Sequence, residues 1–414
     1  MPLKSDIGRR IGYLCLAGLG CSSNTELVAP PPPPPAAFTL TVLPEQDDQA
    51  TSEALGWGGG IPGMQLSFSR VDATSPSTFT TSGAGTIAVT GLAAGTYTIA
   101  GERWLTPSER SRLQPGDDAW GYSVKATVAI AVSGGGQVRA SATRQRSLLI
   151  SEWGFNYGII PGVSSYRLGG YIELFNNSDT TVYLDGIRVG EAYSLDVELP
   201  SATCSEQLPL KADPAYLWSG RFQRFPGGGR HYPLAAGEAV VVATDAIDHG
   251  PIIPDGLDLR TADFEFTGPA DVDNPSVPNM IDDGLRSHPF GHGFYGGTLV
   301  SVIFVAAPVD LSQLPSQRDR SDLDYRGFPR ARILDAAGLR SEYVSAEPEC
   351  LPVVHSNFDR GPERLINRLS GGFLESAQRR LAAPANRTQV ALLHSRNARI
   401  DFVLRPRNPG TVQP

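Results

Sequence analysis

Three histidines and an aspartate lie close together in the middle of the 414-residue chain and could bind a metal ion. They are Asp248, His249, His288 and His292. Imidazole and carboxylate groups are zinc ligands, and zinc with an open coordination position activates water for hydrolysis. The spacing of His288 and His292 suits one face of a helix, but Pro289 and Gly291 oppose a helix there. A metal-dependent hydrolase of the cell envelope is therefore the alternative hypothesis.

A strongly acidic stretch, residues 245–283, offers oxygen ligands that calcium prefers. It contains ten acidic residues and one basic residue, Arg260. Asp271 and Asp273 come closest to a ligand run, but no glycine or bidentate glutamate falls in EF-hand register. Residues 359–414 contain ten arginines and four acidic residues. We therefore favour a solvated acidic face, or pairing of the two stretches, over a metal site.

The prediction for cofactors is accordingly none, with calcium or zinc as the alternative. The side chains that would hold such an ion are His249, Asp271, Asp273 and His292. Residues 291–296 read G-x-G-x-x-G, yet a dinucleotide site needs a strand before and a helix after this motif. The sequence lacks a G-x-S-x-G elbow, an H-E-x-x-H helix and a Walker loop. We predict no catalytic residues and a protein that is not an enzyme.

Aromatic and arginine side chains are concentrated in three predicted loops, 154–169, 217–232 and 284–297. Such side chains dominate the energetics of protein interfaces, and loops at one end of a rigid scaffold commonly bind partners. The candidate binding residues are Phe155, Tyr157, Trp218, Arg230 and Tyr295. Trp153, Phe155 and Tyr157 also alternate along one strand, a pattern more typical of core residues than of a carbohydrate-binding platform.

The elements that position these loops are expected to be β-strands. Glycine and proline contribute 45 and 34 residues, or 79 of 414, which is about 19% against roughly 12% in average usage. Short runs of alternating polar and apolar residues between glycine-rich turns are typical of sandwich strands. The formal net charge of −8 disfavours nucleic acid as a partner.

The N-terminal residues predict export and a lipid anchor. Three cations, Lys4, Arg9 and Arg10, precede an apolar run at 11–20, as in a signal peptide. A small residue directly before Cys21 resembles the lipobox of bacterial lipoproteins, in which the cysteine is acylated; a buried N-terminal helix is the alternative. In the tether at 21–37, six consecutive prolines would span about 20 Å as polyproline II. The predicted location is the bacterial cell envelope, as an outer-membrane lipoprotein facing the periplasm or the cell surface.

Two cysteines, Cys204 and Cys350, would remain in the exported fold. Thiols in an oxidising compartment can pair, so we predict a disulfide between them. Two free thiols are the alternative, and a metal site is disfavoured because neither has a cysteine or histidine at short spacing.

Residues 38–146 resemble a prealbumin-like, or carboxypeptidase-regulatory-like, domain. The resemblance lies in Gly85 to Ile99, where Gly-Leu-Ala-Ala-Gly-Thr-Tyr joins two alternating runs. In that family the motif forms a hairpin of two core strands, and the domains are β-sandwiches without catalytic residues.

Residues 147–407 resemble the lamin-tail domain, an immunoglobulin-like β-sandwich, and 408–414 are predicted to be a tail. The likeness lies in Ile-Ser-Glu at 150–152, in Ile-Glu-Leu-Phe-Asn at 172–176 and in the apolar run at 298–305. The predicted fold class is therefore mainly β, with a prealbumin-like sandwich followed by a larger lamin-tail-like sandwich with long loops.

The sequence of the acidic stretch and the order of the two domains resemble those of a family of exported bacterial lipoproteins common in Bacteroidota. That family carries no established activity, so the resemblance implies architecture and location. The predicted function is a membrane-anchored, non-catalytic binding or accessory module, with an envelope protein or outer-membrane transporter as partner.

Overall fold

The computed structural model describes most of the chain after residue 36. The described residues are 37–70, 75–115, 117–131, 133–154, 158–160, 163–166, 168–192, 210, 212–253, 255–268, 272–285, 300–318, 324–341, 354–361, 363–365, 375–384 and 389–412. The chain divides into two units, Met1–Pro34 and Pro35–Pro414. The first unit, which includes Cys21, lies outside the described residues. In the described part no helix is long and apolar enough to cross a membrane.

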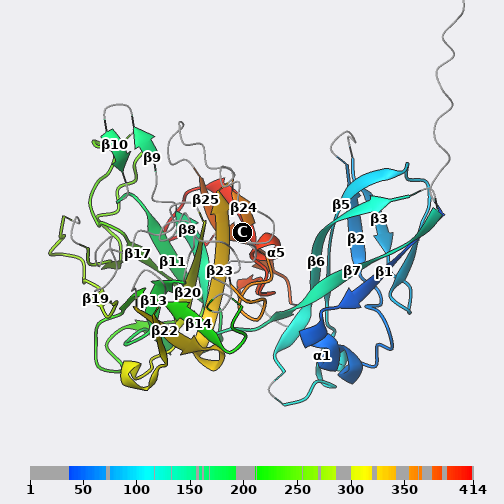
Figure 1. The fold of residues 1–414 in the computed structure, drawn as a ribbon, viewed down its shortest axis with the longest axis horizontal. Coiled ribbons are helices and arrows are strands. Elements are labelled where there is room, and N and C mark those ends of the chain that lie inside the picture. The colour runs from blue at the N-terminus through cyan, green and yellow to red at the C-terminus, as the bar shows by residue number, and fades with distance from the viewer. Residues whose placement is uncertain are drawn as a thin grey trace, which may run out of the picture. The chain divides into compact units, whose positions relative to one another are not determined.

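The first part of the larger unit is built on one seven-stranded sheet with strand order β3-β2-β5-β6-β7-β1-β4 (Figure 1). Its strands are β1 (Ala37–Pro44), β2 (Gln65–Ser69), β3 (Ser77–Thr80), β4 (Thr86–Val89), β5 (Gly95–Trp104), β6 (Ala119–Ile130) and β7 (Ser133–Arg144). The short helices are η1 (Gln46–Asp48), α1 (Gln49–Ala54) and α2 (Pro107–Arg110). Alternate residues of the strands, such as Leu40, Leu66 and Ile99, are fully buried in one hydrophobic core, as expected for period-2 patterning.

The glycine-rich motif at 91–97 forms a turn, but the predicted hairpin is wrong. β4 pairs with β1, whereas β5 pairs with β2 and β6, so the two strands are not hydrogen bonded to each other. Gly91 adopts φ 81°, a left-handed conformation that favours glycine. The Tyr97 hydroxyl donates to the Ala93 carbonyl at 2.9 Å. The motif therefore carries the chain from one end of the sheet order to its interior.

The second part contains two six-stranded sheets with a shared core. The first has the order β18-β17-β11-β8-β25-β28 and the second β19-β15-β13-β20-β23-β24. The strands of the first sheet are β8 (Leu148–Gly154), β11 (Tyr171–Asn176), β17 (Ala239–Ala243), β18 (Phe264–Glu265), β25 (Glu375–Arg379) and β28 (Phe402–Pro406). Those of the second are β13 (Arg188–Glu191), β15 (Arg221–Arg224), β19 (Ile281–Asp282), β20 (Val300–Ala306), β23 (Ile333–Ser341) and β24 (Glu363–Leu365). Ile150 and Leu174 of the first sheet share one core with Val189 and Ile303 of the second, which is the arrangement of a β-sandwich.

A three-stranded sheet adds a further core on the other face of the second six-stranded sheet. Its order is β14-β22-β21. Phe328 of β22 and Leu217 of β14 are buried with Val302 and Phe304 of β20. The remaining elements are β9 (Gly158–Ile160), β10 (Val163–Tyr166), β12 (Val182–Tyr183), β14 (Tyr216–Ser219), β16 (Pro233–Leu234), β21 (Ser316–Arg318), β22 (Asp324–Pro329), β26 (Leu381–Ala382), β27 (Ala391–Leu392), α5 (Ala398–Asp401), η2 (Leu311–Gln313) and η3 (Arg330–Arg332). The prediction of a mainly β chain is confirmed.

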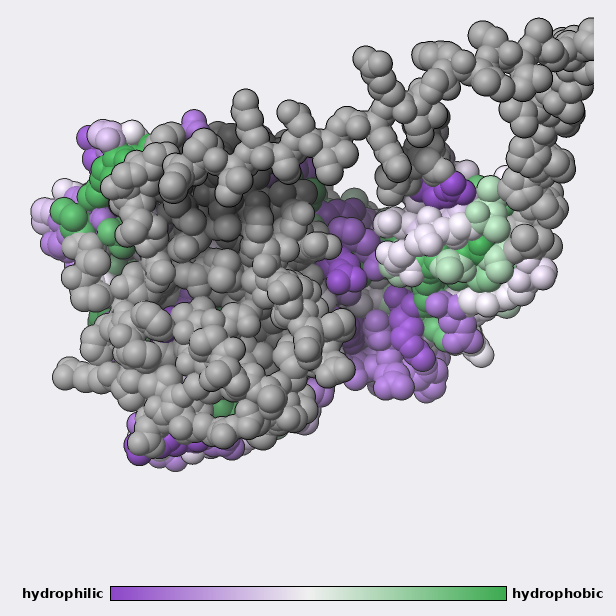
Figure 2. All heavy atoms as spheres, turned by 45° about the horizontal axis from the view of Figure 1, so that its top comes forward, coloured by the Kyte–Doolittle hydropathy of each residue, from purple (hydrophilic) through white to green (hydrophobic). Residues whose placement is uncertain are grey.

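Large apolar side chains on the described surface are scattered. Those that are exposed are Ile252, Val272, Ile281, Val390 and Val403. Figure 2 shows hydrophilic and hydrophobic areas alternating over the described atoms that face the viewer. Isolated exposed apolar residues are normal in folded proteins and do not by themselves mark an interface.

Candidate functional site

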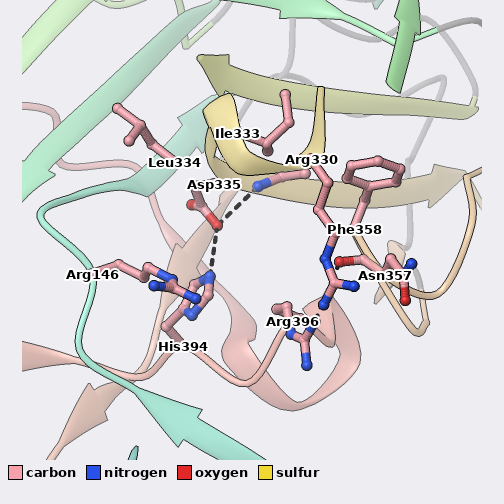
Figure 3. Close-up of a pocket in the computed structure, with 10 residues that line it drawn as sticks. Arg146, Arg330, Ile333, Leu334, Asp335, Asn357, Phe358, His394 and Arg396 are labelled. Atoms are coloured by element: carbon pink, nitrogen blue, oxygen red, sulfur yellow. Dashed lines mark hydrogen bonds and ion pairs between the residues drawn. The ribbon is translucent and has the colours of Figure 1, made fainter. Parts of the chain in front are cut away.

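A small polar cavity of about 70 Å³ opens beside the start of β23 (Figure 3). Its described lining residues are Arg146, Arg330, Ile333, Leu334, Asp335, Ala336, Asn357, Phe358, His394 and Arg396. One water molecule needs roughly 10–15 Å³ of cavity volume, so this cavity can hold several waters or a small ion. Three arginines around one hollow make it the candidate functional site.

Separate parts of the sequence supply the polar side chains of this cavity. Arg146 lies between β7 and β8, Arg330 begins η3, and Asp335 is the third residue of β23. His394 and Arg396 lie between β27 and α5. The paired strands thus fix Asp335, while short connections present the other four side chains.

Asp335 is held by a buried ion-pair network. Arg379 Nη2 lies 2.5 Å from Asp335 Oδ2, and Arg379 Nη1 lies 3.2 Å from Asp401 Oδ2. The Ile150 N–H donates to Asp335 Oδ2 at 2.8 Å, and the Ala336 N–H donates to Asp335 Oδ1 at 2.9 Å. Burial is the largest single effect and opposes ionisation of Asp335, but Arg379, His394 and the Ile150 N–H together hold the pKa below its usual value. Asp335 is therefore an ionised carboxylate whose oxygens are already engaged.

His394 contacts the same carboxylate and keeps one ring nitrogen unengaged. Its Nε2 lies 3.4 Å from Asp335 Oδ1 (Figure 3). Its Nδ1 is buried and has no hydrogen-bond partner among the described residues. Burial, together with the charges of Arg379 and Arg146, lowers the pKa of His394 to about 4. The imidazole is therefore neutral at pH 7.

Arg396 combines a strained backbone with an incompletely satisfied side chain. Its φ of 55° lies in the left-handed region, which costs a non-glycine residue about 1–3 kcal/mol. Its Nε is buried without a hydrogen-bond partner among the described residues, while Nη2 lies 3.7 Å from Asp48 Oδ1. Burial and the neighbouring Arg360 lower the pKa of Arg396 to about 10. Strain and missing partners of this kind are typical of binding sites.

The other two arginines reach the cavity from its rim. Arg330 is exposed and has no ion pair with a described residue, whereas Arg146 Nη1 lies 3.1 Å from Asp118 Oδ2. Among the described lining residues the only carboxylate is Asp335, which Arg379 already neutralises. The cavity therefore has an excess of positive charge and suits an anion, because guanidinium groups bind oxyanions with paired N–H donors.

His249, the centre of the metal hypothesis, is a buried histidine with both ring nitrogens engaged. Its Nδ1 lies 2.6 Å from the Tyr166 hydroxyl, and its Nε2 lies 2.9 Å from the Asp245 carbonyl. Asp273 Oδ1 accepts a hydrogen bond from Asn279 at 2.6 Å. Among the described residues, no group of three or more histidine, cysteine, aspartate or glutamate side chains is placed to hold a metal ion.

Of the predicted binding residues, two are described and they differ in exposure. Trp218 is a correction: it lies in β14, only 3% exposed, and its Nε1 donates to Asp213 at 2.9 Å. It is itself part of the three-stranded sheet, and its side chain packs in a core cluster with Leu210 and Tyr325. Arg230 is exposed.

The loop that carries Arg230 is held in one conformation. Asp185 accepts backbone N–H groups from Gly229 at 3.0 Å, His231 at 2.9 Å and Tyr232 at 3.0 Å. The guanidinium of Arg230 lies 5.2 Å from the centre of the Tyr183 ring, within range of a cation–π contact. The loop presents Arg230 from a fixed backbone, so its place as a candidate binding residue stands.

Several predicted site residues lie outside the described part of the chain. They are Cys21, Phe155, Tyr157, Cys204, Asp271, His292, Tyr295 and Cys350. The lipid anchor, the disulfide and the binding residues predicted at 155, 157 and 295 thus rest on sequence alone, although β9 and β10 lie within the predicted loop 154–169.

Several charged residues of the acidic and basic stretches pair with other segments of the chain. Within 245–283, Asp283 pairs with Arg188 and Arg224 from neighbouring strands. In the basic stretch, Arg360 pairs with Asp48 at 3.2 Å, and Arg379 pairs with Asp335. Local strand pairing, which overall charge does not reveal, decides these partners.

The cavity residues were not singled out by sequence reasoning. Arg330, Asp335, His394 and Arg396 follow no motif spacing, and their common location depends on strand pairing between distant segments. One available signal was the arginine excess at 359–414, which contains Arg379 and Arg396.

Comparisons with known proteins support the fold. No protein-family model matches the sequence, and no curated protein matches it. The crystal structure of a DUF4876 family protein from Bacteroides thetaiotaomicron matches with a TM-score of 0.52 and 16% sequence identity. The match covers 92% of this chain and 98% of that chain. The chain therefore shares its mainly β fold, over nearly its full length, with a protein of a domain-of-unknown-function family.

Proposed function

We propose that the protein is a binding module of the bacterial cell envelope that holds a small anion, or the anionic end of a larger ligand, in the basic cavity. The observation that supports this function is the charge of the lining. Arg146, Arg330 and Arg396 meet at one hollow, and the described lining carboxylate, Asp335, is committed to Arg379. Arg330 has no ion pair with a described residue, so an oxyanion would supply a negative charge to it.

Two features of Arg396 support the same proposal. Its buried Nε has no partner among the described residues, and an unsatisfied buried donor costs about 1–3 kcal/mol. Burial and neighbouring positive charge also lower its pKa to about 10. A bound anion would accept from the guanidinium and relieve both costs.

The proposed location follows from the sequence. Cys21 would carry the lipid, and the prolines at 30–35 would separate the folded unit from the membrane. An envelope protein or outer-membrane transporter is the proposed partner, with Arg230 on its fixed loop as a contact residue. The alternative hydrolase gains no support from His249, since both ring nitrogens are engaged.

Calorimetric titration with inorganic phosphate, using the full chain with Cys21→Ser, tests the function. Arg330→Ala should weaken binding about tenfold, the usual effect of losing one charge-assisted contact. Arg332→Ala is the matched control, because Arg332 lies on the same exposed 3₁₀ helix and does not line the cavity. The melting temperature of both variants should stay near that of the parent chain.

Two results would overturn the proposal. One is that neither phosphate nor a carboxylate such as acetate or lactate binds at millimolar concentration. The other is that Arg330→Ala and Arg332→Ala weaken binding equally, since the cavity would then have no special role.

A further inference from the structure

We infer that the anion held in the basic cavity carries its own O–H donor beside its negative charge, and that His394 Nδ1 accepts this hydrogen bond. The inference rests on the proposed function and adds the chemical class of the ligand. Hydrogen phosphate, phosphate monoesters that keep a proton, and hydroxycarboxylates belong to this class. Sulfate and simple carboxylates do not.

The position of His394 determines which ring nitrogen carries the proton. Nε2 lies 3.4 Å from Asp335 Oδ1, and an ionised carboxylate can only accept. The proton of the neutral ring therefore belongs on Nε2, and Nδ1 presents a lone pair. The interaction with Asp335 thus makes Nδ1 an acceptor.

The lone pair on Nδ1 has no donor in the protein. His394 is 4% exposed, and Nδ1 has no hydrogen-bond partner among the described residues. A buried acceptor without a donor is unfavourable, so an incoming O–H group gains a hydrogen bond that no described residue offers. Water can also supply such a donor, but an anion without a proton cannot.

The rest of the polar lining would not distinguish one oxyanion from another. Guanidinium groups are donors only, so Arg146, Arg330 and Arg396 can bind any oxyanion of suitable size. His394 Nδ1 adds an acceptor among these donors. A site that accepts a hydrogen bond from a ligand O–H disfavours a similar anion without that group. With such an anion, Nδ1 would stay unpaired and its lone pair would face a negatively charged oxygen.

A protonated His394 would reverse this logic, because Nδ1–H would donate. Burial and the charges of Arg379 and Arg146 oppose that state and lower the pKa of His394 to about 4. The choice between acceptor and donor is therefore measurable as ligand preference at pH 7.

Phosphate and sulfate provide the direct comparison. The two ions have similar size and shape, but at pH 7 phosphate keeps at least one proton and sulfate keeps none. Calorimetry at matched ionic strength, on the full chain with Cys21→Ser, should give phosphate an affinity at least about tenfold higher than sulfate. His394→Phe retains a ring of similar size without nitrogens, and should bring the two affinities within about twofold.

A second pair of probes separates the two sources of the O–H group. Lactate carries a hydroxyl beside its carboxylate, whereas propionate does not. Preference for lactate over propionate would assign the site to hydroxy acids. Preference for phosphate over sulfate without any preference for lactate would assign it to phosphate groups.

Each outcome decides the inference. Equal binding of phosphate and sulfate by the parent chain, together with equal binding of lactate and propionate, overturns it but leaves the anion-binding function supported. Selectivity for phosphate that persists in His394→Phe also overturns it, because another group would then accept the hydrogen bond from the phosphate O–H. If His394→Phe fails to fold, the two ligand pairs on the parent chain remain the test.

Discussion

Glu152 of β8 and Glu173 of β11 are direct register partners on neighbouring strands, and both carboxylates are buried. The Asn408 N–H donates to Glu152 Oε1 at 3.1 Å, and the Gly410 N–H donates to Glu173 Oε2 at 2.7 Å. The first residues of the predicted tail, 408–414, therefore cover two facing carboxylates. We expect the buried carboxylate of Glu173 to make stability depend on pH.

Replacement of Glu173 by glutamine should reduce that dependence. Burial raises the pKa of Glu173 from 4.5 to about 7, and the charge of Glu152 adds to the increase. Between about pH 4.5 and 7, Glu173 keeps its proton in the folded chain and loses it in the unfolded chain, so stability falls as pH rises. The cost reaches at most about 3 kcal/mol above pH 7. Glu173→Gln should reduce this slope in urea unfolding between pH 5 and 8. A remainder is expected from Asp401 and Asp359, because burial raises their pKa values to about 7 and about 6.

The exposed carboxylate of Glu375, on β25, provides the control. Glu375→Gln should leave the slope of stability against pH unchanged. A Glu173→Gln variant that loses as much stability between pH 5 and 8 as the parent chain would show that another group causes the dependence.

Removal of the cation that serves two buried carboxylates should strongly destabilise the fold. The Arg379 side chain is 1% exposed, and it pairs with Asp335 and Asp401. Arg379→Met keeps much of the length but leaves both carboxylates without this partner. Breaking a buried ion pair in this way costs about 3–5 kcal/mol, measurable by urea unfolding at pH 7.

An exposed ion pair provides the comparison. The Arg318 side chain is 58% exposed beside Asp324, and exposed pairs contribute little. Arg318→Met should barely change the melting temperature. If Arg379→Met unfolds at the same urea concentration as Arg318→Met, the buried network does not stabilise the protein as argued.

Loss of the predicted acylated cysteine should release the protein from the membrane. Cys21→Ser should move the chain from the membrane fraction to the soluble fraction and abolish palmitate labelling. Unchanged fractionation and no label in the parent chain would refute the anchor. Cys15→Ser is the control, because that residue would leave with the signal segment.

The two remaining cysteines should form one disulfide in the exported protein. Alkylation without reductant should add no label to Cys204 or Cys350. Reduction should expose both thiols to alkylation and lower the melting temperature. Such a bond closes a long loop, which in the chain-entropy model adds several kcal/mol to stability. Two alkylated thiols in unreduced protein would contradict the pairing.

Strand positions were predictable where one segment carried its own pattern. The Ile-Ser-Glu and Ile-Glu-Leu runs fall in β8 and β11, which are adjacent in the first six-stranded sheet. The partners of β4 and β5 were not predictable in the same way. A turn motif specifies the bend at Gly91, whereas strand pairing depends on contacts across the whole sheet.

The candidate site was harder to predict because each of its residues has an ordinary local context. Arg146, Asp335 and His394 carry no spacing that signals a site, and β23 must pack beside β8 before these side chains meet. The Trp218 prediction failed for a related reason. An aromatic residue next to a glycine-rich loop suits an interface, but its packing with Leu210 and Tyr325 has no signature in the sequence.

Strand β20 contributes to two cores at once. Ile303 and Val305 point into the core between the six-stranded sheets, while Val302 and Phe304 point into the core under β22. A one-residue slip would exchange apolar residues for apolar residues, so hydrophobicity cannot hold the register. Gly190 can fix the register, because it lies opposite Phe304, where any side chain would clash: a Cβ at position 190 would lie 2.7 Å from Phe304 Cε1. The layers on either side of β20 should consequently unfold in one cooperative step, and neither can be excised as an independent fragment.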